Sequence, residues 1–274
     1  MQPQLEKLFG QTVVIENRPG GGGMLAATTV ARAQPDAYTL LLGTAGTLAI
    51  TPALSRNVTF DPVNDFTPLT IAIETPICLL VRKELPANSV ADLVAYAKAN
   101  PGKLSFGSSG PNTSHHLAGE FLKVLAGIDM VHVPYRGGNP AMTDFLAGQI
   151  PVLFATLSTA LPHMQSGNFK VLGTVEARRS REHPEIPTIG ESVPGYAIPS
   201  SFLGFVAPAG LSAPLTQRLN AILVQTIETP TVRKTLEGSG FEVVTSTSAE
   251  FGNTIRAALE RYRRIAADAR IEAQ

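Results

Sequence analysis

The sequence of 274 residues has a single cysteine, few charged residues and no net charge. Charged residues make up 16% of the chain, against a usual share of about 25%, and 22 basic residues balance 22 acidic ones. Nucleic acids and anionic membranes both favour a basic excess, so neither is an expected partner. No apolar run reaches the roughly 18 residues that a membrane span needs. The composition predicts a folded globular protein that is not inserted in a membrane.

Metal-binding and cofactor-binding patterns are also missing. Cys78 cannot form an internal disulfide, and its apolar neighbours indicate a small core residue rather than a nucleophile. His115 and His116 are adjacent, so on a helix they point about 100° apart and cannot chelate one ion as an i, i+4 pair could. The other histidines have no cysteine or carboxylate at ligand spacing. We expect neither a metal nor a cofactor.

The start of the chain departs from the usual order of an α/β lobe. Residues 1–3 do not open a signal peptide, and residues 5–9 have the apolar spacing of a helix that Gly10 ends. The first predicted strand, residues 12–15, follows that helix. A parallel lobe normally places a strand before it, so we expect this chain to lack its first β-strand and the turn after it.

From there strands and helices alternate, which predicts mainly parallel sheets covered by helices. The predicted strands are residues 38–42, 104–106, 130–133, 150–154, 169–174 and 202–206. The predicted helices are residues 24–33, one capped by Ser89, residues 114–125, one with Asn139 as cap and Pro140 at its first position, one opened by Ser212 and a final amphipathic helix.

The pattern restarts near residue 85 and returns to the first set after a Pro-rich connection, residues 178–199. This predicts two α/β lobes, one made of residues 1–84 and 198–274 and the other of residues 85–197. The chain would cross between the lobes twice. Two crossings predict a hinge and a ligand cleft between the lobes.

A Gly/Ser turn, residues 107–116, is the main candidate for a binding site. It joins a strand to a helix, where backbone N–H groups at the positive end of a helix dipole can hold a carboxylate. Its candidate ligand contacts are Ser108, Ser109, Gly110, Thr113 and His116. Thr113 is equally a plain helix N-cap, and His116 can serve either the turn or the ligand.

Other candidates follow other predicted strands, at the carboxyl ends where open α/β sheets bind ligands. They are Thr44, Thr47, Tyr135, Arg136, Gly137 and Thr156. A glycine turn, residues 16–23, also joins a strand to a helix, but it lacks the spacing of a dinucleotide or P-loop motif and is more simply a tight turn.

Catalysis is the weaker interpretation of these turns. The Gly-x-Ser-x-Gly pattern of hydrolases fails because Pro111 stands two residues after Ser109. No acid/base pair and no nucleophile with an activating partner is recognisable. Turns rich in glycine and hydroxyl groups favour binding, so we assign no catalytic residue and predict that the protein is not an enzyme.

Eight segments resemble the Bug family, the substrate-binding receptors of tripartite tricarboxylate transporters. They are residues 14–20, 60–68, 97–104 with 107–110, 116–120, 132–137, 187–192 and 205–210, in order along nearly the whole chain. The resemblance implies a periplasmic receptor with the type II, Venus-flytrap fold. Such a receptor traps a small di-, tri- or aromatic carboxylate and presents it to membrane permease subunits. Family members hold the carboxylate through backbone amides, hydroxyls and bridging waters.

One departure from the family pattern bears on the ligand, and two other functions stay open beside the receptor hypothesis. Many relatives carry an acidic residue where this chain has Ala155, so a ligand ammonium has one fewer partner and we favour a plain carboxylate over an amino acid. An α/β hydrolase-like enzyme using Ser109 is the alternative from another class. A ligand sensor that serves a signalling partner instead of a permease is the third.

Overall fold

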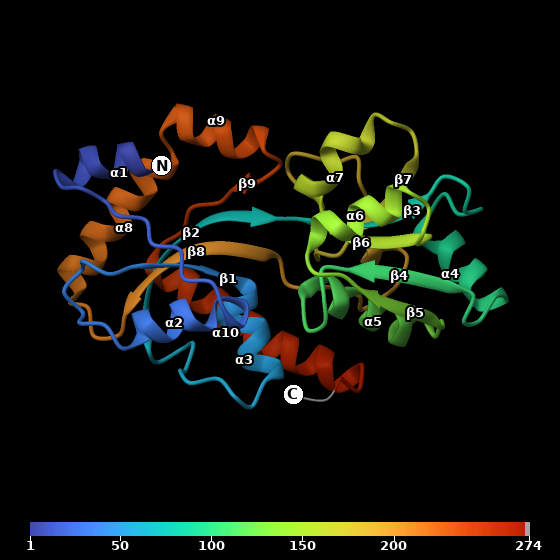
Figure 1. Cartoon of the computed structure of the whole chain (residues 1–274), viewed down its shortest axis with the longest axis horizontal. Coiled ribbons are helices and arrows are strands. Elements are labelled where there is room, and N and C mark those ends of the chain that lie inside the picture. Colours follow the sequence, from blue (N-terminus) through green and yellow to red (C-terminus); the bar gives the residue numbers. More distant parts are fainter. Residues whose placement is uncertain (272–274) are drawn as a thin grey trace. The chain divides into compact units, whose positions relative to one another are not determined.

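The computed structural model describes residues 1–271. Its strands form two separate sheets, one of four strands and one of five. The chain divides into two compact units (Figure 1): residues 1–74 with 202–260 form unit 1, and residues 75–201 with 261–271 form unit 2. The sequence-based boundary was placed after residue 84, whereas this division falls at residue 75 and assigns β3 to unit 2. Each unit is an α/β layer structure of its own.

Unit 1 contains a sheet with the strand order β1-β8-β2-β9. Its strands are β1 (Leu41–Thr44), β2 (Phe66–Thr75), β8 (Ser201–Pro208) and β9 (Glu242–Val243). Its helices are α1 (Gln2–Phe9), η1 (Gly21–Gly23), α2 (Met24–Ala31), η2 (Gly46–Ile50), α3 (Thr51–Leu54), α8 (Ala213–Ile227), α9 (Pro230–Gly238) and most of α10 (Ser248–Asp268). β1 runs antiparallel to β8, and β2 runs antiparallel to β9.

The two faces of the unit 1 sheet bury different helices, because successive side chains of a strand point to opposite faces. Phe205 and Ala207 of β8 join the apolar cluster of α1 and α8, which lie side by side in Figure 1. Phe202 of β8 instead meets Phe251 of α10 edge to face, with ring centroids 5.4 Å apart. The alternation along β8 therefore gives the sheet a helix layer on each side.

The strand predicted at residues 12–15 is absent, and the prediction was wrong. Val14 is 82% exposed and Ile15 is 63% exposed, so neither side chain gains the burial that stabilises a strand. The backbone of Val13 is satisfied by side chains of α1: its N–H donates to Glu6 Oε1 at 3.2 Å, and its carbonyl accepts from Gln2 Nε2 at 2.8 Å. These bonds replace a strand partner.

Unit 2 contains a mixed sheet with the strand order β5-β4-β6-β3-β7. Its strands are β3 (Ile77–Arg82), β4 (Leu104–Ser108), β5 (Met130–Pro134), β6 (Val152–Thr156) and β7 (Phe169–Thr174). Its helices are α4 (Val90–Ala99), α5 (Ser114–Ala126), α6 (Gly138–Leu146), α7 (Leu157–Met164) and η3 (Ile189–Glu191). β4, β5 and β6 are parallel to one another, whereas β3 is antiparallel to both β6 and β7.

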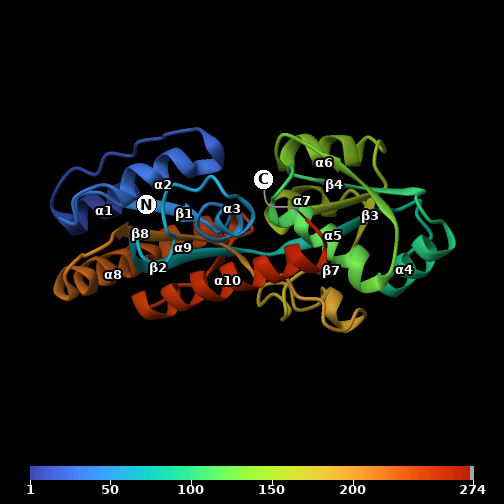
Figure 2. The same ribbon diagram turned by 90° about the horizontal axis from the view of Figure 1, so that it is seen from below.

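Helices cover both faces of the unit 2 sheet, as Figure 2 shows for α5 and α6. Met142 and Phe145 of α6 pack in one apolar cluster with Leu153 of β6 and Leu80 of β3. Phe106 of β4 points to the opposite face, toward α5. Alternate strand residues therefore pack against different helix layers. Because both faces of the sheet are covered, only the ends of the strands are free to approach a ligand.

Several helix ends in unit 2 are where the sequence placed them. Ser89 caps α4 by accepting a hydrogen bond from Asp92 N–H at 3.1 Å. α6 differs, because it begins at Gly138 with Gly137 as its N-cap, and Pro140 therefore lies in the first turn rather than at the first position. Proline is tolerated there because the first-turn N–H groups have no partner within the helix.

The C-terminal part of α10 belongs to unit 2. The Arg261 guanidinium donates to the Ala197 carbonyl at 3.0 and 3.2 Å and lies 5.2 Å from the ring centroid of Phe121. The buried Tyr262 hydroxyl donates to the Pro199 carbonyl at 3.2 Å. These contacts make the end of the helix a structural part of unit 2.

Candidate functional site

Three loops converge at one edge of the unit 2 sheet. β4, β5 and β6 run in the same direction, so their carboxyl ends, Ser108, Pro134 and Thr156, lie at one edge. Each strand is followed at once by a helix, α5, α6 or α7, whose N-terminus lies at that edge. A helix N-terminus presents unpaired N–H groups and the positive end of its dipole. This edge therefore suits an anion without needing a lysine or arginine.

Ser108 fixes the shape of the first loop. Its side chain is fully buried, and its Oγ accepts from Gly110 N–H at 3.1 Å. The same Oγ lies 3.2 Å from the Gly110 carbonyl and 2.7 Å from Nε2 of His132 on β5. The Ser108 hydroxyl makes its hydrogen bonds within the protein, so Ser108 shapes the loop and has no free hydroxyl to offer a ligand.

Ser109 is only partly buried and is paired with a histidine. Its Oγ lies 2.5 Å from Nδ1 of His115, the second residue of α5. His115 is buried, and burial lowers its pKa to about 4, so the imidazole is neutral near pH 7. Sequence reasoning found no activating partner for Ser109, because a bond across this turn depends on loop geometry that spacing does not reveal.

The Ser109–His115 pair lacks the rest of a catalytic constellation. In a nucleophilic triad the second ring nitrogen is held by a carboxylate that orients the base and stabilises its charged form. His115 Nε2 is buried and has no hydrogen-bond partner among the described residues. A base with a pKa near 4 is also poorly matched to proton abstraction at neutral pH. The arrangement can orient a hydroxyl, but it is not equipped to activate one.

Thr113 and His116 form the start of α5. Thr113 is the N-cap: its Oγ1 accepts from His116 N–H at 3.3 Å and donates to the Gly110 carbonyl at 2.7 Å. His116 Nδ1 accepts from Asn112 N–H at 3.2 Å. Thr113 is thus an N-cap, and His116 makes a hydrogen bond within the turn. These bonds hold the loop in one conformation.

Two imidazoles stack beside this loop. The rings of His116 and His132 lie 4.1 Å apart and nearly parallel, and His132 stacks in turn on Phe106 at 5.0 Å. Desolvation, helped by repulsion from the positive charges of His116 and Lys123, lowers the pKa of His132 to about 4. Desolvation also lowers the pKa of His116. The stack is therefore uncharged at neutral pH.

The second loop, after β5, contacts the first. Tyr135 N–H donates to the Ser108 carbonyl at 3.1 Å, and a Cβ at Gly110 would lie 3.1 Å from the Tyr135 carbonyl. Gly137 has a φ of 119°, which favours glycine, and it is the N-cap of α6. Arg136 is exposed. The structure thus brings Ser108, Gly110 and Tyr135 together.

The third loop carries a small hydroxyl network at the start of α7. Thr156 Oγ1 lies 2.8 Å from Thr159 Oγ1 and accepts from Ser158 Oγ at 3.1 Å. A Cβ at Gly138, the first residue of α6, would lie 3.8 Å from Thr159 Oγ1. The N-termini of α6 and α7 are therefore neighbours, and Thr156 joins the same edge.

Thr44 and Thr47 form a separate cluster in unit 1. Thr47 N–H donates to Thr44 Oγ1 at 3.1 Å, the two hydroxyls are 3.1 Å apart, and Thr47 Oγ1 donates to the Gly22 carbonyl at 3.3 Å. A Cβ at Gly23, where φ is +93°, would lie 2.7 Å from Thr47 Oγ1. The glycine turn is thus a tight turn that packs on Thr47, which is buried, while Thr44 is half-buried.

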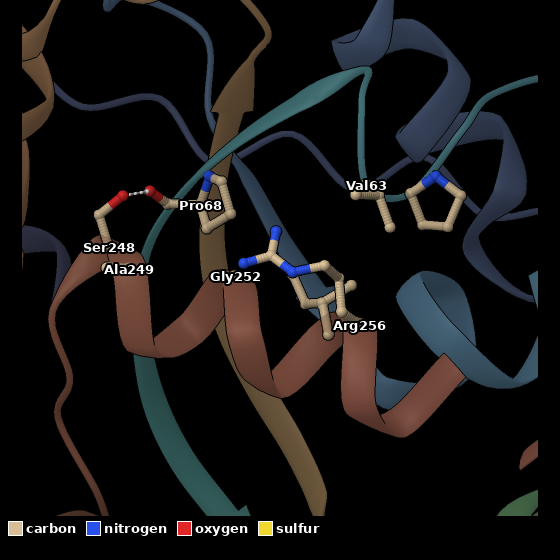
Figure 3. A pocket seen from close by; sticks show the side chains of 8 residues that line it. Val63, Pro68, Ser248, Ala249, Gly252 and Arg256 are labelled. Carbon is tan, nitrogen blue, oxygen red and sulfur yellow. Dashed lines mark hydrogen bonds between the residues drawn. The ribbon is translucent and has the colours of Figure 1, made fainter. Parts of the chain in front are cut away.

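A small pocket of unit 1 lies elsewhere (Figure 3). It has a volume of about 210 Å³, less than the roughly 300 Å³ at which ligand sites begin, and lies between α10 and the start of β2. Ser248 closes one side by donating to the Pro68 carbonyl at 2.6 Å, and Arg256 reaches over the opening. None of the candidate site residues lines this pocket.

Within residues 1–271, no group of three or more histidine, cysteine, aspartate or glutamate side chains is placed to hold a metal ion. None of the helices in that range combines the length and the apolar composition that crossing a bilayer requires.

The fold and the sequence both match known receptors. The family model described as the tripartite tricarboxylate transporter family receptor matches residues 1–270. The UPF0065 protein in the tcbD-tcbE intergenic region of Pseudomonas sp. strain P51 is 30% identical over 272 residues, which cover 98% of this chain and 80% of the relative. BugT of Bordetella pertussis is 27% identical over 259 residues, covering 94% of this chain and 79% of BugT.

Two similar structures were solved with carboxylates. Rpa4515 of R. palustris with adipate has a TM-score of 0.85 and 31% identity, covering 99% of this chain and 91% of that one. MatC from Rhodopseudomonas palustris with bound malate has a TM-score of 0.80 and 28% identity, covering 96% of this chain and 91% of that one. The fold and these matches define a solute-binding receptor with the two-lobed periplasmic-binding-protein fold, not an enzyme. The chain belongs to the tripartite tricarboxylate transporter receptor family, which includes the Bug proteins. The resemblance seen in the sequence is confirmed.

Proposed function

We propose that this receptor binds a small organic carboxylate at the edge of unit 2 where α5, α6 and α7 begin. The observation that carries the proposal is the convergence of three helix N-termini on a loop whose hydroxyls and glycines are held in one conformation. Charge-assisted hydrogen bonds from backbone N–H groups stabilise an anion without a cationic side chain. The adipate and malate bound to similar structures support this ligand class.

The proposed ligand contacts are the residues singled out in the sequence. In unit 2 they are Ser109, Gly110, Thr113, His116, Tyr135, Arg136, Gly137 and Thr156. Ser108 is fully buried, so its proposed contribution is to hold the loop that contacts the ligand. In unit 1 the hydroxyl cluster of Thr44 and Thr47 is proposed as a separate ligand contact, in which the buried Thr47 holds Thr44.

Among carboxylates, a ligand without an ammonium group fits best. Ala155 is 2% exposed and packs in the apolar cluster with Cys78 and Leu153, so its position provides no negative charge. An ammonium group would therefore lose hydration without gaining an ion pair there. Di-, tri- and aromatic carboxylates are the proposed substrates.

The proposed setting is the periplasm, where the receptor would deliver its ligand to the permease subunits of a tripartite tricarboxylate transporter. Membership of the receptor family supports this setting. Uptake of labelled ligand by cells that express the receptor with such a permease tests the delivery step. Uptake that is unchanged when the receptor is deleted would instead favour a sensor role.

Titration calorimetry with adipate, malate, citrate, benzoate and glutamate tests ligand binding directly. We expect at least one carboxylate to bind and to raise the melting temperature as its concentration exceeds Kd. Ser109→Ala should weaken that binding about tenfold, because a hydrogen bond to a charged group is lost. Ser166→Ala, in the turn after the far end of α7, is the matched control. Failure of every carboxylate to bind would overturn the proposal.

A further inference from the structure

The bond between Ser109 and His115 leaves one buried nitrogen without a partner. Ser109 Oγ is 2.5 Å from His115 Nδ1, while His115 Nε2 is buried and has no hydrogen-bond partner in the described chain. A buried polar atom without a partner costs free energy, because the hydrogen bond it made to water is lost and not replaced. The cost differs between the two neutral forms of the imidazole, so it bears on which form is present.

The two tautomers have opposite consequences for the serine. If Nε2 carries the hydrogen, a donor is buried without an acceptor, and Ser109 must donate its own hydrogen to Nδ1. If Nδ1 carries the hydrogen, only a lone pair is left unpartnered at Nε2, and Ser109 accepts at Oγ while its O–H remains available. Buried donors without partners are the rarer defect in proteins. The Nδ1–H form is therefore favoured.

The neighbouring serine provides an internal comparison. Ser108 also meets an imidazole, at 2.7 Å from His132 Nε2, but its Oγ is fully buried and already bonded to Gly110. Ser109 is the partly exposed member of the two, and it lies in the loop between β4 and Thr113, the N-cap of α5. Only at Ser109 does the direction of the hydroxyl hydrogen decide what the loop offers to a ligand.

We propose that His115 is a positioning residue whose Nδ1–H donates to Ser109 and thereby directs the Ser109 hydroxyl hydrogen to the ligand. Ser109 is then a hydrogen-bond donor, as a carboxylate oxygen requires, and one of its two lone pairs is already occupied by His115 Nδ1–H. The inference rests on the proposed carboxylate site and adds a residue that selects acceptor groups there. It also explains why a Ser–His pair occurs in a receptor.

The tautomer can be measured without any ligand. We expect ¹⁵N–¹H correlation spectra of the ligand-free protein at pH 7 to show His115 with a protonated Nδ1 and an unprotonated Nε2. His115→Gln serves to assign the signals. A protonated Nε2 on His115 would overturn the inference, whether or not a carboxylate binds.

Binding by variants tests the consequence. His115→Leu should weaken carboxylate binding about tenfold or more, as Ser109→Ala does, and the double variant should lose little further. His115→Gln keeps a donor side chain and should recover part of the affinity. His163→Leu, near the end of α7, is the matched control. Circular dichroism and the urea midpoint verify that each variant is folded.

The outcomes are distinguishable. Unchanged affinity in folded His115→Leu, or losses that simply add in the double variant, would overturn the role of His115 while leaving the carboxylate site in place. If no carboxylate binds the wild-type protein, the proposed function fails, whereas a protonated Nδ1 would still uphold the orientation assigned to Ser109.

Discussion

Gly119 of α5 lies directly against the ring of Phe106 on β4. A Cβ at Gly119 would lie 2.2 Å from Cε2 and 2.5 Å from Cζ of Phe106, closer than side chains approach one another. Phe106 is fully buried and also meets the rings of His132 and Phe154. His132 also contacts Ser108 in the loop after β4, so a shift of the Phe106 ring would disturb that loop. The contact between Gly119 and Phe106 therefore affects the candidate site.

Gly119→Ala should destabilise the protein by about 1 to 3 kcal/mol, because the added methyl group overfills a packed core. Urea unfolding measures the change in the free energy of unfolding. The matched control is Gly238→Ala at the end of α9, where a Cβ would meet no atom within 4 Å. It should be neutral or slightly stabilising. Equal effects in both variants would contradict the packing explanation.

Thr113→Ala should remove the N-cap of α5 and lower the free energy of unfolding by about 1 kcal/mol. The lost bonds are those to His116 N–H and to the Gly110 carbonyl. Thr113→Ser keeps the hydroxyl and should recover most of the stability in the same urea titration. If serine behaves like alanine, the hydroxyl is not what stabilises this helix end.

Stability should fall as the pH drops from 6.5 to 4. Burial lowers the pKa of His115 from 6.5 to about 4, so in that interval the unfolded chain binds a proton that the folded chain does not. The shift corresponds to roughly 3 kcal/mol from His115. Urea unfolding at several pH values, compared between wild type and His115→Gln, isolates this contribution. A pH dependence that is identical in the two proteins would contradict it.

Cys78 should resist thiol reagents in the folded protein. It is fully buried on β3, and burial raises the pKa of its thiol well above the usual value, so little of the reactive thiolate forms. Labelling with a disulfide reagent should be slow in native buffer and rapid in urea. Rapid labelling of the native protein would show that unit 2 opens locally around β3.

Helix boundaries were the most predictable part of the fold, because their signals are local. Ser89 and Thr113 cap the helices that the sequence assigned to them, and Gly10 ends α1 with a φ of 69°. β2 and β3 were not predicted. β3 lies inside its sheet, between β6 and β7, with almost every residue buried, so its sequence is continuously apolar and lacks the alternation that identifies a strand.

The sequence predicted which loops form the candidate site, but it did not predict the hydrogen bonds between their side chains. Residues after β4, β5 and β6 were identified because carboxyl ends of parallel strands share an edge. His115 was noted only as an unsuitable metal ligand, and His132 as an isolated histidine. Their bonds to Ser109 and Ser108 arise from the path of the turn and the alignment of two strands, which no spacing within one segment encodes.

Because Arg261 and Tyr262 belong to unit 2, that unit can complete its folding only after the C-terminal part of the chain has been synthesised. The sheet of unit 2 emerges from the ribosome well before these two residues do, and until they arrive Phe121 lacks the guanidinium that covers it and Pro199 lacks its hydroxyl donor. Residues 75–201 of the nascent chain therefore lack part of their packing until the C-terminal part of α10 has been synthesised. A receptor translated without the C-terminal part of α10 would have an incompletely packed unit 2 and would be more susceptible to proteolysis.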